Sequence, residues 1–226
     1  QYPEVNGDID WAYDLMYKKR VLGSQRALQF GGKPIFKHHA RVYNCIASYI
    51  DRLRFFQECM YLLLCGCGVG FSVQKHHINK LPKLVHKKEG TKKYTIPDTI
   101  EGWSDSIGVL VSSYFEDDNL FPSYKGKTVN FDFSEIRPVG SYLSSSSGKA
   151  PGPEPLKKAL TNIKKVLDKA LKDALFSNRR LKPIDAYDVV MHSADAVISG
   201  GVRRSATICL FSPDDEEMAR AKTGNW

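Results

Sequence analysis

Five cysteines carry the most reactive side chains in this 226-residue sequence, at positions 45, 59, 65, 67 and 209. An odd number of cysteines does not fit the disulfide framework of a small secreted domain, so reduced thiols are expected. Cys65 and Cys67 have the wrong spacing for a zinc knuckle and no matching second pair, so both are predicted to be small buried residues. Cys45 lies in an apolar segment, where a single cysteine is usually a core residue. The residues around Cys45 do not by themselves indicate that its thiol is redox-active.

Three glycine-rich segments could bind phosphate through backbone amides: residues 66–70, 144–153 and 200–201. None has the spacing of a dinucleotide fingerprint or a Walker loop, so each is a weak indication by itself. Arg203 and Arg204 follow the last segment, and paired guanidinium groups at a loop tip suit recognition of a phosphate or a base. The alternative interpretation is two surface salt bridges.

Two adjacent histidine pairs, His38-His39 and His76-His77, were considered as metal ligands. Neighbouring side chains of a strand point to opposite faces, so neither pair is expected to bind one ion. Both pairs are interpreted as surface residues, and no metal site is predicted.

The chain is basic, with 33 Lys and Arg against 25 Asp and Glu and a formal net charge of +8. This charge favours polyanionic partners, such as nucleotides, nucleic acid or acidic lipid headgroups, without choosing between them. Much of the excess lies in residues 83–93 and 157–180, which are more simply a solvated loop and a solvated helix face. No stretch approaches the roughly 18 apolar residues of a membrane span, and no secretory leader opens the sequence. A soluble, cytoplasmic protein is expected, and the missing start methionine suggests a piece of a longer chain.

The elements that must position these residues follow from hydrophobic periodicity and capping signals. Residues 31–34 are predicted to be a turn, and residues 80–94 a basic surface loop. Strands and helices alternate without hairpin signals, which favours a mostly parallel α/β layout. Helices are predicted at about 8–20, 51–64, 99–115, 156–174 and 183–198, and strands at about 41–48, 71–74, 127–133 and 207–211.

Taken in order, seven segments resemble the successive motifs of ribonucleotide reductase catalytic subunits. The resemblance covers nearly the whole chain and is closest to the adenosylcobalamin-dependent (class II) members, chiefly through GKAPGPEPL and GGVRRSA. The segments are SQRALQFGGKP (24–34), YNCIASYID (43–51), LLLCGCGVGFSVQKHHINKLP (62–82), FDFSEIRPVGS (131–141), GKAPGPEPL (148–156), SGGVRRSA (199–206) and FSPDDEEMARAKTGNW (211–226).

The resemblance implies that residues 1–226 form the first half of a ten-stranded α/β barrel, with mostly parallel strands and surrounding helices. Such enzymes reduce ribonucleotides to deoxyribonucleotides by thiyl-radical chemistry inside the barrel. Cys45 would then be one of the two reducing cysteines, and Asn44 would face the ribose. The backbone at Cys67 and Gly68 would approach the substrate, because glycine lets the main chain come close. The family usually has small residues other than cysteine at positions 65 and 67.

Allosteric residues are implied in the same way. Asp51 would accept a hydrogen bond from the deoxyribose of a dNTP or ATP effector, and Arg137 and Lys149 would hold its phosphates. A mobile specificity loop would connect the effector to the substrate base. Its residues are Gly200, Gly201, Val202, Arg203, Arg204 and Ser205.

By the resemblance, the second half of the barrel, with the radical cysteine and the second reducing cysteine, is expected to lie outside this sequence. The chain alone is therefore expected to be inactive and to need that half, as a second chain or a missing segment. Further expected partners are a ribonucleoside di- or triphosphate, a thioredoxin-like reductant and adenosylcobalamin, whose contacts lie mostly outside this chain. Between Val85 and Thr95 we predict no insertion of the kind that replaces the partner subunit in monomeric members. A homodimer of complete subunits is expected, with helices at 100–115 and 156–174 pairing across it.

Two other functions are compatible with the sequence. A regulatory module that binds dNTPs would keep the effector loops without the chemistry. A nucleic-acid-binding protein is supported only by the net charge, since no recognised nucleic-acid motif is present.

Overall fold

The computed structural model describes residues 2–85, 87, 90–116, 120–142, 149–173, 179–198 and 205–223. The chain divides into two compact units, Gln1–Asn44 and Cys45–Trp226. Among the described residues, no helix has both the length and the apolar character needed to cross a membrane.

The first unit is helical. Its elements are η1 (Pro3–Val5), α1 (Asn6–Tyr17), α2 (Gln25–Phe30), α3 (Lys33–Lys37) and η2 (His39–Val42). The turn predicted at residues 31–34 is shorter than expected, because Pro34 lies in the first turn of α3, where a missing backbone N–H costs nothing. The 3-10 turn η2 likewise takes up the start of the strand predicted at 41–48.

The second unit is α/β. Its elements are β1 (Cys45–Tyr49), α4 (Arg54–Leu64), β2 (Gly68–Ser72), α5 (Lys75–Ile78), β3 (Thr91–Thr95), α6 (Ile100–Ser112), η3 (Pro122–Tyr124), β4 (Thr128–Asp132), α7 (Glu154–Asp173), α8 (Pro183–Ile198), β5 (Thr207–Leu210) and α9 (Glu216–Ala219).

The described strands form two parallel ladders, a three-stranded sheet in the order β1-β2-β5 and a pair β3-β4. The predicted parallel layout is therefore confirmed. Successive parallel strands in sequential order, joined by right-handed crossovers, place all their connecting helices on one face of the sheet. Phe71 of β2 shows which face this is, since its ring lies 6.1 Å from Phe55 of α4 and 6.5 Å from Tyr187 of α8.

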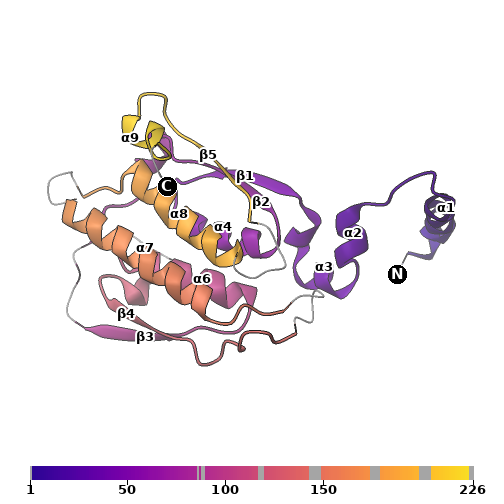
Figure 1. Ribbon diagram of the computed structural model, residues 1–226, viewed down its shortest axis with the longest axis horizontal. Coiled ribbons are helices and arrows are strands. Elements are labelled where there is room, and N and C mark those ends of the chain that lie inside the picture. The colour runs from indigo at the N-terminus through magenta and orange to yellow at the C-terminus, as the bar shows by residue number, and fades with distance from the viewer. Residues whose placement is uncertain are drawn as a thin grey trace. The chain divides into compact units, whose positions relative to one another are not determined.

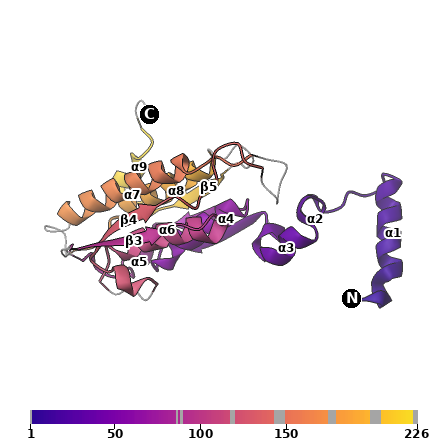
Figure 2. The same ribbon diagram turned by 90° about the horizontal axis from the view of Figure 1, so that it is seen from below.

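Four helices build the core beside this sheet. Helices α7 and α8 lie side by side, and α4 and α6 pack beneath them (Figures 1 and 2). Helix α6 begins as predicted, because the Thr99 side chain caps it by accepting a hydrogen bond from Gly102 N at 2.9 Å. The core includes the fully buried side chains of Phe55, Met60, Ile107, Leu156 and Ile163.

Strand β3 begins in the segment that we predicted to be a surface loop, so that prediction is wrong for residues 91–94. The strand pairs with β4, where Tyr94 packs edge-on against Phe131 and Lys93 forms a 2.7 Å ion pair with Asp132. Its lysines hide the strand pattern, because Lys93 is exposed to solvent while Lys92, on the other face of the strand, extends its ammonium group over the Tyr124 ring.

Candidate active site

One face of the β1-β2-β5 sheet carries no covering helix from the described part of the second unit. On this face Tyr49 is 53% exposed, Leu210 59% and Ile208 67%. The three strands stand in register, since a Cβ on Gly70 would lie 3.5 Å from Ala47 Cβ and 3.3 Å from Ile208 Cγ2. We call this surface the open face. By strand register it consists of Cys45, Ala47, Tyr49, Gly68, Gly70, Ser72, Ile208 and Leu210.

Cys45 is the first residue of β1 and is exposed on the open face. Its partner in the neighbouring strand is Gly68, which has no side chain to cover the thiol. On the other side of β2, Val69 N donates a 2.9 Å hydrogen bond to Ala206 O, just before β5. One end of the open face thus combines a thiol, bare backbone and the residues that follow the predicted specificity loop.

The other cysteines are less suited to chemistry. Cys59, Cys65 and Cys67 are at most 1% exposed, which confirms that Cys65 and Cys67 are buried small residues. Burial raises the pKa of Cys59 to about 12 and the pKa of half-buried Cys209 to about 11, so neither forms a thiolate readily. Because the Cys67 side chain is buried, only its backbone remains for the contact predicted with a ligand.

A polar cluster lies at the other end of the open face. His77 Nδ1 is 2.9 Å from Ser72 Oγ, and the His77 ring stacks on Tyr49 with 4.5 Å between centroids. The His76 and His77 rings are 3.9 Å apart, because both residues lie in the helical turn α5 and not in a strand. Our interpretation of them as residues on opposite strand faces is wrong. Burial, together with the nearby charges of His76 and Lys80, lowers the pKa of His77.

The predicted effector residues do not all meet. Arg137 donates to Asp98 at 2.5 Å and to Tyr142 O at 3.4 Å, and Tyr142 forms an antiparallel bridge with Lys149. The structure therefore brings Arg137 and exposed Lys149 together at this bridge, which we call the Arg137–Lys149 bridge. An anion would have to compete with the Asp98 carboxylate for the Arg137 guanidinium.

Asp51 lies elsewhere, two residues after the end of β1, and accepts a 2.9 Å hydrogen bond from Arg52. Arg52 also contacts Glu58 at 2.6 Å. Within the described residues, Asp51 has no hydrogen bond or ion pair with Arg137 or Lys149.

Most of the predicted specificity loop, namely Gly200, Gly201, Val202, Arg203 and Arg204, lies outside the described residues. Ser205 is described, and its hydroxyl is buried without a hydrogen-bond partner in that part of the chain.

A cavity of about 390 Å³ lies between β4, α6 and α7, and sequence patterns did not predict it. Lys87 reaches it from the segment before β3 and donates to Ser113 Oγ at 2.8 Å and to Lys127 O at 3.0 Å. Its ammonium group also lies 3.5 Å from the centroid of the Tyr114 ring. The interpretation of residues 83–93 as a solvated loop is therefore wrong at Lys87. The cavity is lined by Lys87, Leu110, Ser113, Tyr114, Thr128, Val129, Asn130, Phe131, Phe133, Lys157, Leu160, Thr161, Lys164 and Asp168.

The buried position of Lys87 predicts how stability changes with pH. Burial lowers its pKa from 10.5 to about 8, so between these values the unfolded chain binds more protons than the folded chain. The free energy of unfolding is expected to rise from about pH 8 to about pH 10, by at most about 1.4 kcal/mol per pH unit. The rise is smaller to the extent that solvent reaches the side chain. Lys87→Met should remove it in urea titrations, whereas Lys83→Met, at an exposed lysine, should keep it; equal rises in both would contradict the assignment.

Comparison with known proteins is consistent with this geometry. A family model described as "B12-dependent ribonucleotide reductase, insertion domain" matches residues 72–167. The adenosylcobalamin-dependent ribonucleoside-triphosphate reductase of Lactobacillus delbrueckii subsp. bulgaricus (strain ATCC BAA-365 / Lb-18) is 32% identical over 190 residues, which are 71% of this chain and 24% of that protein. The enzyme of the same name from Lactobacillus leichmannii is 31% identical, with the same shares covered. The chain thus spans about a quarter of the length of these relatives.

A solved structure shows the same fold. The crystal structure of a B12-dependent (class II) ribonucleotide reductase matches 97% of this chain and 36% of its own chain, with a TM-score of 0.77 and 25% identity. The predicted fold class, α/β with mostly parallel strands from part of the reductase barrel, is therefore confirmed.

The insertion-domain match corrects one expectation. It spans residues 85–95, where we predicted no insertion, so the argument for a homodimer loses its premise. The helices expected to pair across that dimer, α6 and α7, pack against each other within this chain. Together, the family model, the curated relatives and the solved structure lead to one conclusion: this chain is similar in sequence and fold to part of the adenosylcobalamin-dependent (class II) ribonucleotide reductases.

Proposed function

We propose that this chain supplies one wall of the active site of a ribonucleoside-triphosphate reductase, with Cys45 as one of its two reducing cysteines. The observation that carries the proposal is the exposed Cys45 thiol on the open face, directly beside the bare backbone of Gly68. The triphosphate substrate follows from the names of the curated relatives.

The chemistry assigned to Cys45 is a two-electron reduction. Cys45 and a second cysteine, from the part of the enzyme outside this chain, each give up one proton and one electron and become a disulfide. The substrate loses its 2′-hydroxyl as water and gains hydrogen at that carbon, so that atoms and electrons balance. A thioredoxin-like dithiol would then exchange with the disulfide and restore both thiols.

The rest of the open face fits a sugar-binding wall. Gly68 and Gly70 allow a ribose to approach the main chain of β2, because no Cβ stands in the way. The exposed apolar side chains of Ile208 and Leu210 would otherwise face water, which favours a covering layer from the remainder of the enzyme. Asn44, just before Cys45, is proposed to contact the ribose hydroxyls.

Adenosylcobalamin is proposed as the cofactor, because the curated relatives are named for their dependence on it. When bound, it supplies the radical that starts the reaction. Among the described residues, no group of three or more His, Cys, Asp or Glu side chains could hold a metal ion, and we assign no cofactor contact to them. Their proposed roles concern the substrate and the effector.

Effector binding is proposed at the Arg137–Lys149 bridge, where two cations and backbone amides could hold phosphates. Asp51 is proposed to bind the effector's deoxyribose, and residues 200–205 to carry the signal to the substrate base. Two ordered arrangements of that loop, each favoured by a different effector, would account for base selection.

Complementation tests the proposed function. The chain is mixed with the remaining reductase sequence, supplied as a second polypeptide, together with adenosylcobalamin, a dithiol and a ribonucleoside triphosphate. Deoxynucleotide should form only when both polypeptides are present. Product from this chain alone, or effector binding without any product in the mixture, would contradict the assignment; the second outcome would indicate a regulatory module.

A further inference from the structure

The segment before the active-site strand contains many basic residues and no acidic one, and only Asp14, just before it, pairs with one of them in the described part of the chain, Lys18, at 2.6 Å. From Leu15 to Asn44 the sequence has no Asp or Glu. The same stretch contains seven basic residues: Lys18, Lys19, Arg20, Arg26, Lys33, Lys37 and Arg41. Most such side chains can point into water, where an excess of charge costs little.

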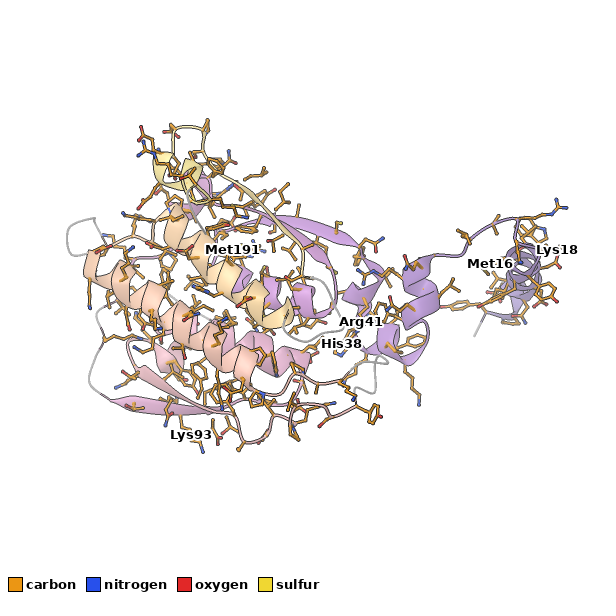
Figure 3. The ribbon with its side chains drawn as sticks, viewed as in Figure 1. Met16, Lys18, His38, Arg41, Lys93 and Met191 are labelled. Carbon is orange, nitrogen blue, oxygen red and sulfur yellow. The ribbon has the colours of Figure 1, made fainter. Side chains whose placement is uncertain are left out.

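Arg41 does not point into water. It lies in η2 and is only 3% exposed, and its Nε and Nη1 atoms are buried with no hydrogen-bond acceptor among the described residues. Its described contact is with the Phe30 ring, whose centroid lies 5.3 Å from the guanidinium carbon. Figure 3 labels Arg41 beside His38, whose carbonyl accepts the Arg41 backbone N–H at 3.0 Å. His38 itself is 8% exposed, so its interpretation as a surface residue is wrong.

A second guanidinium lies at the same ring. The guanidinium carbon of Arg26 is 5.7 Å from the Phe30 centroid, and its Nε donates a 2.8 Å hydrogen bond to Asn44 Oδ1. Arg26 therefore holds the side chain that precedes Cys45. Two positive groups around one buried ring repel each other, and an uncompensated buried charge costs several kcal/mol. This arrangement calls for an anion.

We propose that Arg41 binds a phosphate group, and that Arg26 and Phe30 form the support of this site. We identify this phosphate as part of a nucleotide, and that identification rests on the proposed function. A phosphate suits the site because it can be shared by both guanidinium groups and carries more than one negative charge. Through Arg26 and Asn44, phosphate binding would also fix the residue next to the reducing thiol.

The test uses inorganic tripolyphosphate as the probe, at constant ionic strength, with calorimetric titration and thermal unfolding of the chain. The wild type should bind the probe and gain thermal stability from it. Arg41→Met, which keeps the length but removes the charge, should bind at least about tenfold more weakly. Without the probe, Arg41→Met should unfold at the same temperature as the wild type or higher, because it removes an unpaired buried charge. Lys37→Met removes an exposed charge from the same segment and should behave like the wild type.

Several outcomes would overturn the proposal. These are a wild type that does not respond to tripolyphosphate, an Arg41→Met variant that binds equally well, or a Lys37→Met variant that loses as much. If Arg41→Met fails to fold, Arg41→Lys tests the same point, since it keeps the charge and should retain part of the binding. The replacement of Arg41 could instead change stability only when the complementary polypeptide is present, with no dependence on phosphate. That result would identify the anion as a carboxylate of the polypeptide and exclude phosphate. Cys45→Ser should bind the probe normally, so that a failure of the reductase assignment is distinguishable from a failure of this site.

Discussion

Replacing Cys45 by serine in the complemented enzyme should abolish sustained nucleotide reduction, with turnover falling by at least about a thousandfold. A hydroxyl cannot form a disulfide or supply the electrons that replace the 2′-hydroxyl, whereas the side chain keeps its size and exposure. Turnover is measured as deoxynucleotide formed per enzyme in the presence of excess dithiol. Effector binding, which we propose at the Arg137–Lys149 bridge, should be unchanged, because Cys45 lies on the open face and that bridge does not.

Cys209→Ser is the matched control. It makes the same change in the neighbouring β5 strand of the same sheet, but the Cys209 side chain points to the helix-covered face beside Phe71. This variant should keep most of its turnover after correction for folded protein. Equal loss in both variants would show that thiol removal harms the sheet in general, and full activity of Cys45→Ser would remove Cys45 from the mechanism.

Truncating Phe71 to alanine should lower the free energy of unfolding of the chain by about 3 to 5 kcal/mol. Phe71 is 2% exposed and joins β2 to Phe55 and Tyr187, so its loss leaves a cavity between the sheet and two helices. Urea unfolding followed by far-ultraviolet circular dichroism measures the change through the midpoint at constant slope. A loss below about 1 kcal/mol would mean that the helices do not pack there as described.

Gly70, the preceding residue in β2, provides the opposite case. Its Cβ would meet Ile208 Cγ2 at 3.3 Å and Ala47 Cβ at 3.5 Å, which small shifts of side chains can relieve. Gly70→Ala should therefore change the stability of the chain by less than about 1 kcal/mol. It should nevertheless reduce turnover in the complemented enzyme, because the new methyl group stands on the open face. Two neighbouring residues of one strand thus separate folding from function.

The framework of the second unit was predictable because its signals are local and strong. Helices α6, α7 and α8 show clear apolar periodicity, and the sequence offers Asp98 or Thr99 as the N-cap of α6, a role that Thr99 has in the structure. The alternation of strands and helices without hairpin turns was enough to predict parallel strands. Cys45, however, could be identified only by family resemblance, because the sequence around it is typical of an ordinary apolar strand.

The errors share a physical cause, which is that tertiary contacts override local polarity. Lysines 92 and 93 made β3 look like a loop, although pairing with β4 defines it as a strand. The sequence around Lys87 indicates a surface residue. Its ammonium group nevertheless donates hydrogen bonds to carbonyl and hydroxyl oxygens from distant parts of the chain. In both cases a partner far away in the sequence decides the environment.

The uneven shielding of the five sulfur atoms also has a practical use. A fluorophore that alkylates thiols would react with Cys45, at the start of β1, much faster than with the buried cysteines. Attached there, the dye would respond to the polarity of its surroundings as the complementary polypeptide closes over it. The chain therefore contains its own reporter position for the assembly that the proposed function predicts.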